Sequence, residues 1–240
     1  MKHIRIAICV LAVNLLASCE DKPVLTSDVV TISLPKNELS ADGMSTLKVT
    51  GFLPINAVPD KRSITFKASN GSFQNGTGNS VTLKAETTAQ DGKWPVFATY
   101  IASLDSGSAK IYAVVEGFTD SVTVSLLPVQ AEKIKLTADA FAVKVAFQGE
   151  LNLLCQLFSA GGGSVSKGRK VKFLDTTLGG APVGGSFRSV VSSSNDKSTV
   201  SSIYSPGLAS PGSYIYLKAI VIDPSAKQNV RDSIKIYLTP

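Results

Sequence analysis

From residue 29 to the end of the chain, hydrophobic and polar residues alternate with a period of two. In the first long run, Leu47, Val49 and Leu53 fall on one side of an extended strand, and mainly polar residues fall on the other. Similar runs, rich in Thr, Val, Ile and aromatic residues, recur downstream between clusters of Gly, Asn, Asp and Pro. These features are typical of strands and turns. No window has a helical period, so the pattern predicts an all-β chain.

The pattern of runs occurs twice. Leu151, Leu153 and Leu157 repeat the spacing of the first long run, and later segments repeat at offsets between 104 and 114 residues. Such an offset is close to the ~100 residues of one immunoglobulin-like sandwich. We therefore predict two tandem β-sandwiches at residues 30–128 and 129–240. The other corresponding segments are Ile64-Thr65-Phe66 with Val171-Lys172-Phe173, Gly71-Ser72-Phe73 with Gly185-Ser186-Phe187, and Ser121 to Pro128 with Ser233 to Pro240.

The N-terminus has a different pattern. Lys2 and Arg5 precede an apolar run that ends in Leu16-Ala17-Ser18-Cys19. The apolar run is shorter than the ~20 residues that a membrane-spanning helix needs, and small residues precede the cysteine, as in a cleaved signal peptide. The block resembles a bacterial lipoprotein signal. The resemblance implies cleavage after residue 18, a diacylglyceryl group on Cys19 and membrane attachment through that lipid.

Residues 19–29 are polar and contain Pro23, so we expect them to form a short lipidated tether. The segment Glu20-Asp21-Lys22 resembles the short acidic patch that follows the lipid cysteine in surface-exported lipoproteins. The resemblance implies a cell-envelope protein in the outer membrane, exposed at the cell surface.

Composition excludes several kinds of chemistry. The only histidine, His3, lies in the predicted signal peptide, so the mature chain has no histidine for a catalytic triad or a metal site. Of three cysteines, only Cys155 would remain as a free thiol, and its apolar neighbours indicate a buried hydrophobic residue. Removal of Lys2 and Arg5 lowers the formal net charge from +6 to +4, and the remaining basic residues are scattered, which argues against a nucleic-acid partner. We predict no cofactor and no metal.

An enzyme that used only carboxylates stays as an alternative. A glycosidase needs two acids that flank one bond. No acidic pair stands out from the turns and strand ends, so we predict no catalytic residues and no enzymatic activity. The acids considered are Glu86, Glu116, Glu132 and Glu150.

Several segments of the first repeat resemble a bacterial immunoglobulin-like domain of the invasin and intimin adhesins. The resemblance implies a rigid extracytoplasmic spacer or adhesion module without a catalytic centre. The second repeat matches less well, although Gly212-Ser213-Tyr214 resembles a tyrosine corner, in which a tyrosine hydroxyl binds nearby backbone. The matching segments of the first repeat are Leu39 to Ser45, Ile64-Thr65-Phe66, Asn70-Gly71-Ser72-Phe73, Asp91-Gly92, Gly107 to Ile111 and Ser121 to Leu126.

Three features are candidate contact surfaces. Trp94, the only tryptophan, could stack on a sugar or could instead cover the open end of the first core. Glycine-rich segments at 159–164 and 178–185 could close over a ligand or could simply connect strands. A local basic cluster could meet anionic glycans or lipid head groups, or could protect an edge strand. The cluster consists of Lys167, Arg169, Lys170 and Lys172.

Together these features predict a lipid-anchored, non-enzymatic cell-envelope protein that serves in adhesion or as a scaffold. Its partner would be a protein or a glycan at the cell surface. The alternative is a glycan-binding accessory lipoprotein of a polysaccharide-uptake system.

Overall fold

The computed structural model describes residues 25–222 and 230–240. Cys19 and the predicted signal peptide lie outside the described residues. Within the described ranges the chain is almost entirely β-structure, with one short α-helix, α2 (Thr26–Val29), and one 3₁₀ helix, η1 (Pro59–Lys61). None of the described helices has the length and apolar character needed to cross a bilayer. The all-β prediction is confirmed.

The N-terminal half contains two sheets. One has the strand order β1-β3-β7-β5, and the other has the order β2-β9-β8-β4-β6. Neighbouring strands are antiparallel except for β2 and β9, which run parallel. The strands are β1 (Thr31–Ser33), β2 (Glu38–Ser40), β3 (Thr46–Pro54), β4 (Ser63–Ala68), β5 (Ser72–Phe73), β6 (Ser80–Lys84), β7 (Lys93–Ile101), β8 (Gly107–Val115) and β9 (Phe118–Leu127).

The described part of the C-terminal half repeats this topology without a strand that matches β6. Its sheets have the orders β10-β12-β15-β14 and β11-β17-β16-β13. Again one pair, β11 and β17, is parallel. The strands are β10 (Lys133–Ala138), β11 (Ala142–Lys144), β12 (Leu151–Phe158), β13 (Val171–Thr177), β14 (Ser186–Val191), β15 (Thr199–Ser205), β16 (Tyr214–Val221) and β17 (Arg231–Thr239).

Each half has its own hydrophobic core, built from residues 30–126 in one case and 131–238 in the other. Alternation along the strands accounts for both cores. Leu47, Val49 and Leu53 of β3 are buried, as are Leu153 and Cys155 of β12. Burial, followed by the negative charge of Asp232, raises the pKa of the Cys155 thiol to about 12. The prediction that Cys155 is a buried, unpaired hydrophobic residue is confirmed.

One detail of each core was not expected. The Tyr100 hydroxyl donates to the Asn70 carbonyl oxygen at 2.8 Å, and the equivalent Tyr204 hydroxyl donates to Asp175 at 3.0 Å. Both tyrosines are fully buried. Tyr214, the predicted tyrosine corner, instead begins β16 with its ring half exposed and beside Tyr237. That prediction is wrong, because alternation along β16 turns Tyr214 outward and Ile215 into the core.

The predicted tether at 19–29 is also shorter than expected. Its last four residues form α2, and the following Val30 is buried in the first core. Val29 packs against the same core. The packed structure therefore begins a few residues before the first strand.

Candidate functional site

Trp94 lies near the start of β7, where its ring packs against the first core. Its indole N–H donates to the Ile55 carbonyl oxygen at 3.0 Å. The Arg62 guanidinium lies over the ring at 3.8 Å from its centroid, and the Arg62 Nε donates to the Ala57 carbonyl oxygen at 2.8 Å. These contacts match the core-covering alternative, and a ligand role for Trp94 stays a prediction.

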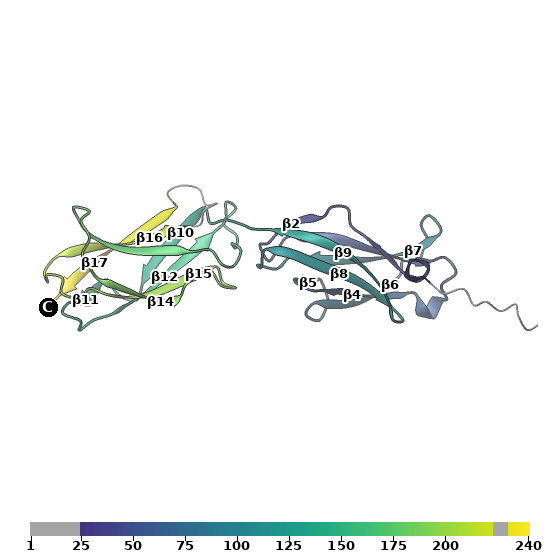
Figure 1. The fold of residues 1–240 in the computed structure, drawn as a ribbon, viewed down its shortest axis with the longest axis horizontal. Helices are drawn as coiled ribbons and strands as arrows, with labels where there is room; N and C mark the ends of the chain where they lie inside the picture. Colours follow the sequence, from purple (N-terminus) through teal and green to yellow (C-terminus); the bar gives the residue numbers. More distant parts are fainter. Residues whose placement is uncertain (1–24, 223–229) are drawn as a thin grey trace, which may run out of the picture.

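Figure 1 shows that the two halves lie end to end, with the chain crossing once between β9 and β10. Ser166, from the segment before β13, lies in this junction. Its hydroxyl donates to the Ala41 carbonyl oxygen at 2.7 Å and accepts from the Val129 N–H at 2.8 Å. The backbone N–H of Ser166 also donates to the Val129 carbonyl oxygen at 3.1 Å. One buried serine thus links both halves and the segment that connects them.

Lys167 extends the same junction. Its backbone N–H donates to the Leu104 carbonyl oxygen at 2.9 Å. Its ammonium group lies 2.6 Å from Asp196 and 3.3 Å from Asp105, one carboxylate from each half. These hydrogen bonds, first from Asp196 and then from Asp105, raise the pKa of Lys167. Lys167 therefore lies at the junction and bridges carboxylates of both halves.

The other members of the predicted basic cluster diverge. Arg169 Nη1 donates to the Gln130 side-chain oxygen at 2.9 Å, close to the junction. Lys170 is exposed, and its carbonyl oxygen accepts from the Ile222 N–H at 3.0 Å. Lys172 lies on β13, which is an edge strand of its sheet. This position agrees with the alternative that the charges protect an edge strand. Lys167 and Arg169 are thus held near the junction, whereas Lys172 lies on β13, and a ligand role for Lys167, Arg169 and Lys170 stays a prediction.

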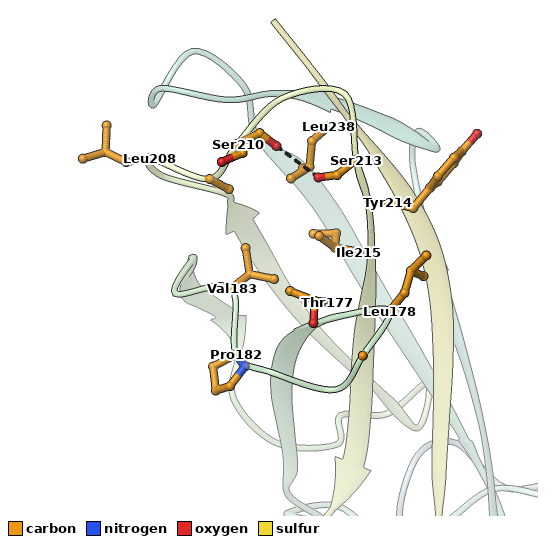
Figure 2. Close-up of a pocket in the computed structure, with 12 residues that line it drawn as sticks. Thr177, Leu178, Pro182, Val183, Leu208, Ser210, Ser213, Tyr214, Ile215 and Leu238 are labelled. Atoms are coloured by element: carbon orange, nitrogen blue, oxygen red, sulfur yellow. Dashed lines mark hydrogen bonds between the residues drawn. The ribbon is translucent and has the colours of Figure 1, made fainter.

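A hollow of about 740 Å³ lies at the end of the C-terminal half, farthest from the junction. The glycine-rich segment 178–185 supplies Leu178, Pro182 and Val183 to its lining. Figure 2 shows Ile215 and Val183 facing the hollow, while the Leu208 side chain projects away from it. Its polar atoms are hydroxyl and backbone groups, such as the Ser213 hydroxyl, which donates to the Ser210 carbonyl oxygen at 3.1 Å. This lining suits apolar contact and offers no acid or base for catalysis.

Two of the four acids considered for a hydrolytic site, Glu116 and Glu150, form ion pairs. Glu116 pairs with Lys61 at 2.8 Å, and Glu150 pairs with Arg188 at 3.5 Å. Both pairs are well exposed, and each lies in a different half of the chain. Exposed acids with cationic partners have neither the burial nor the close second carboxylate that glycosidase chemistry requires.

The sequence missed a group of aromatic and basic residues on the outer face of the β11-β17-β16-β13 sheet. Tyr214 and Tyr237 are cross-strand partners with ring centroids 5.0 Å apart. The Lys235 ammonium lies 4.1 Å from the centre of the Tyr214 ring. The signal was present as Tyr, Lys and Arg at the alternate positions of residues 214–218 and, except for Ser233, of residues 231–237. It could be recognised only once the two strands were known to be neighbours.

No family model matches the sequence, and no curated protein matches it. Solved structures do match. The Yersinia pseudotuberculosis adhesin InvE superposes on 89% of this chain with a TM-score of 0.53 and 14% sequence identity. Invasin, described as a bacterial integrin-binding protein, superposes on 88% with a TM-score of 0.57 and 17% identity. This chain covers 59% of the InvE chain and 39% of the invasin chain. The chain therefore has the immunoglobulin-like β-sandwich fold found in invasin-type bacterial adhesins.

Proposed function

We propose that the protein is a non-enzymatic adhesion or structural module of the bacterial cell envelope, held at the membrane by a lipid on Cys19. In this proposal its two sheet pairs are two domains, bounded at 30–128 and 129–240. The observation that carries the proposal is the end-to-end arrangement of two sandwiches of an adhesin-type fold, joined by hydrogen bonds across their junction (Figure 1).

The junction supports a spacer role. Flexible linkers leave neighbouring domains free to move, whereas packed interfaces with satisfied buried polar groups restrict them. Here Ser166 and Lys167 connect to Ala41, Leu104 and Asp105 of the other half. A chain stiffened at this point would hold its C-terminal end away from a membrane to which its N-terminus is attached.

A glycan-binding accessory lipoprotein is the second candidate function. One observation favours it, namely the ordered tyrosine and lysine side chains on the outer face of β16 and β17. Aromatic rings on an exposed sheet face can pack against sugar rings. Such a role is compatible with lipid anchoring and differs from the spacer role in the ligand it requires.

The anchor can be tested by expressing the full chain, Cys19→Ala and the matched control Cys155→Ala in a bacterium that processes lipoproteins. Cells fed an alkyne-labelled fatty acid should label the wild type and Cys155→Ala but not Cys19→Ala. Protease added to intact cells should remove the labelled protein if it is exposed at the surface. An uncleaved wild-type chain without label would contradict the proposal.

A further inference from the structure

The outer face of the β11-β17-β16-β13 sheet presents three tyrosines and five cations. Cross-strand register places them in rows, because Tyr214 pairs with Tyr237, Tyr216 with Lys235, and Ile220 with Arg231 and Lys172. We call this surface the tyrosine–lysine face. Its members are Tyr214, Tyr216, Tyr237, Lys144, Lys172, Lys218, Arg231 and Lys235.

The face is uniformly basic. At the outward positions of its four strands there is no Asp or Glu. Asp175 points into the core, where it accepts from Tyr204. Asp232 borders the face, but its two oxygens accept from the Leu136 and Ser233 N–H groups, each at 2.8 Å. In the described parts of the chain, the salt bridges are formed by Lys61, Lys167 and Arg188, and none of them joins one of these five cations to a carboxylate.

Part of the face is already ordered. The Tyr214 and Tyr237 rings meet at 53°, and the Lys235 ammonium lies over Tyr214. Farther along the same two strands, Lys218, Arg231, Asp232 and Ser233 line a hollow of about 420 Å³. Ordered aromatic side chains lose little conformational entropy on binding, and paired cations in a hollow favour an anionic group.

The N-terminal half provides an internal comparison. The same face of its β8 and β9 strands also carries a lysine and a tyrosine, Lys110 and Tyr112, with the ammonium 5.4 Å from the ring centre, but it differs at the positions of the tyrosine pair and of Lys235. Ser108 and Ser125 pair across the strands in the register that Tyr214 and Tyr237 occupy in the other half. Thr123 likewise stands where Lys235 stands. Both faces belong to the same fold and both are solvated. Folding alone therefore does not require tyrosine and lysine at these positions.

We propose that the tyrosine–lysine face binds an anionic polysaccharide, one that carries carboxylate or sulfate groups along a chain of sugars. Its cations complement a repeating negative charge, and its tyrosines offer ring surface and hydroxyl groups to sugar rings and sugar hydroxyls. A sheet face is an extended surface, so it suits a polymer rather than a small anion.

This inference names a binding partner for the proposed adhesive role. It rests on that role only in assuming that the face is exposed in the cell envelope. Binding is a property of the folded chain and can be measured without the lipid. Loss of fatty-acid labelling in cells would overturn the anchor, and loss of polysaccharide binding in solution would overturn the face, so the two failures are distinguishable.

The test uses the purified chain from Glu20 to Pro240, which contains every described element. Binding to polygalacturonate and dextran sulfate is measured by calorimetry and compared with binding to neutral dextran. We expect at least one of the two anionic polymers to bind, with affinity that falls as salt is raised, and neutral dextran not to bind. Lys218→Ala with Lys235→Ala should weaken binding by about tenfold or more. The matched control, Lys67→Ala with Lys110→Ala in the other half, should change it less than about twofold.

A second variant copies the N-terminal half. Tyr214→Ser with Tyr237→Ser keeps every charge, and it should weaken polysaccharide binding while leaving weak binding to polyglutamate unchanged. Circular dichroism melts establish that all variants fold. Equal binding by the lysine variant, or tighter binding of the wild type to polyglutamate, single-stranded DNA or phosphatidylglycerol vesicles than to either polysaccharide, would overturn the proposal.

Discussion

The Ser166 hydroxyl donates a 2.7 Å hydrogen bond to the carbonyl oxygen of Ala41, a residue 125 positions earlier in the chain. Ser166 and Ala41 are both fully buried. The same hydroxyl accepts from the Val129 N–H, and the Ser166 carbonyl oxygen accepts from the Ser194 hydroxyl at 2.7 Å. Ser194 is also buried and Val129 is half-buried, so Ser166 is the centre of a hydrogen-bond network that is largely shielded from water.

Replacing Ser166 with alanine should loosen the junction. The change leaves the buried Ala41 carbonyl oxygen and the half-buried Val129 N–H without this partner, and a buried unsatisfied group costs about 1–3 kcal/mol. We expect a lower melting temperature and a broader distribution of distances between the two halves in small-angle scattering. Ser189→Ala, at an exposed position of β14, is the matched control. Identical scattering from Ser166→Ala and the wild type would show that the junction does not depend on this serine.

The junction marks the limit of what the sequence could predict. Alternation identified the buried positions of β3 and β12, because each inward residue follows from its own strand. The grouping of Lys167 with Lys172 by nearness in sequence was misleading. The chain enters β13 between them, so Lys167 meets Asp105 and Asp196 at the junction, while Lys172 shares a row with Arg231. Strand register and the docking of one half on the other bring distant residues together, and neither leaves a local signal.

Alkaline pH should destabilise the fold through its buried tyrosines. Burial raises the pKa of Tyr100 from 10.0 to about 12. Burial, followed by the charge of Asp175 and the hydrogen bond to it, also raises the pKa of Tyr204. Above pH 10 the unfolded chain loses these protons first, so the folded chain binds more protons and stability falls as pH rises. The contribution is fully present below pH 10 and, for Tyr100, is lost as the pH approaches 12.

Denaturant titrations at a series of pH values test whether stability falls as the buried tyrosines titrate. The free energy of unfolding should be level just below pH 10 and should decrease between pH 10 and 12. Tyr100→Phe removes one titrating group, so the decrease should become shallower, although the variant also loses its hydrogen bond to Asn70. An equally steep decrease in Tyr100→Phe would argue against the assignment to this residue.

Cys155 should be unreactive in the folded protein. Its side chain is fully buried and its pKa is raised to about 12, so at neutral pH almost no thiolate is present and none is accessible. In the chain from residue 20 onward Cys155 is the only cysteine. A thiol reagent should therefore release no signal from the native protein and one equivalent after addition of denaturant. Rapid stoichiometric labelling without denaturant would show that β12 opens readily.

The two glycine and tyrosine contacts of the repeated fold give a final prediction. A Cβ atom on Gly71 would lie 2.5 Å from the Tyr100 hydroxyl oxygen, and one on Gly185 would lie 2.5 Å from the Tyr204 ring. Both distances are too short for real contacts, and each tyrosine is fixed by its hydrogen bond, so the ring cannot easily move away. Gly71 also has a φ of +84°, which adds backbone strain in alanine. We expect Gly185→Ala to lower the free energy of unfolding by about 1–3 kcal/mol through overpacking, and Gly71→Ala to lower it further. Gly161→Ala is the control, because its Cβ would meet no atom within 4 Å. If Gly71→Ala and Gly185→Ala unfold at the same denaturant concentration as this control, the tyrosines are not held as the structure describes.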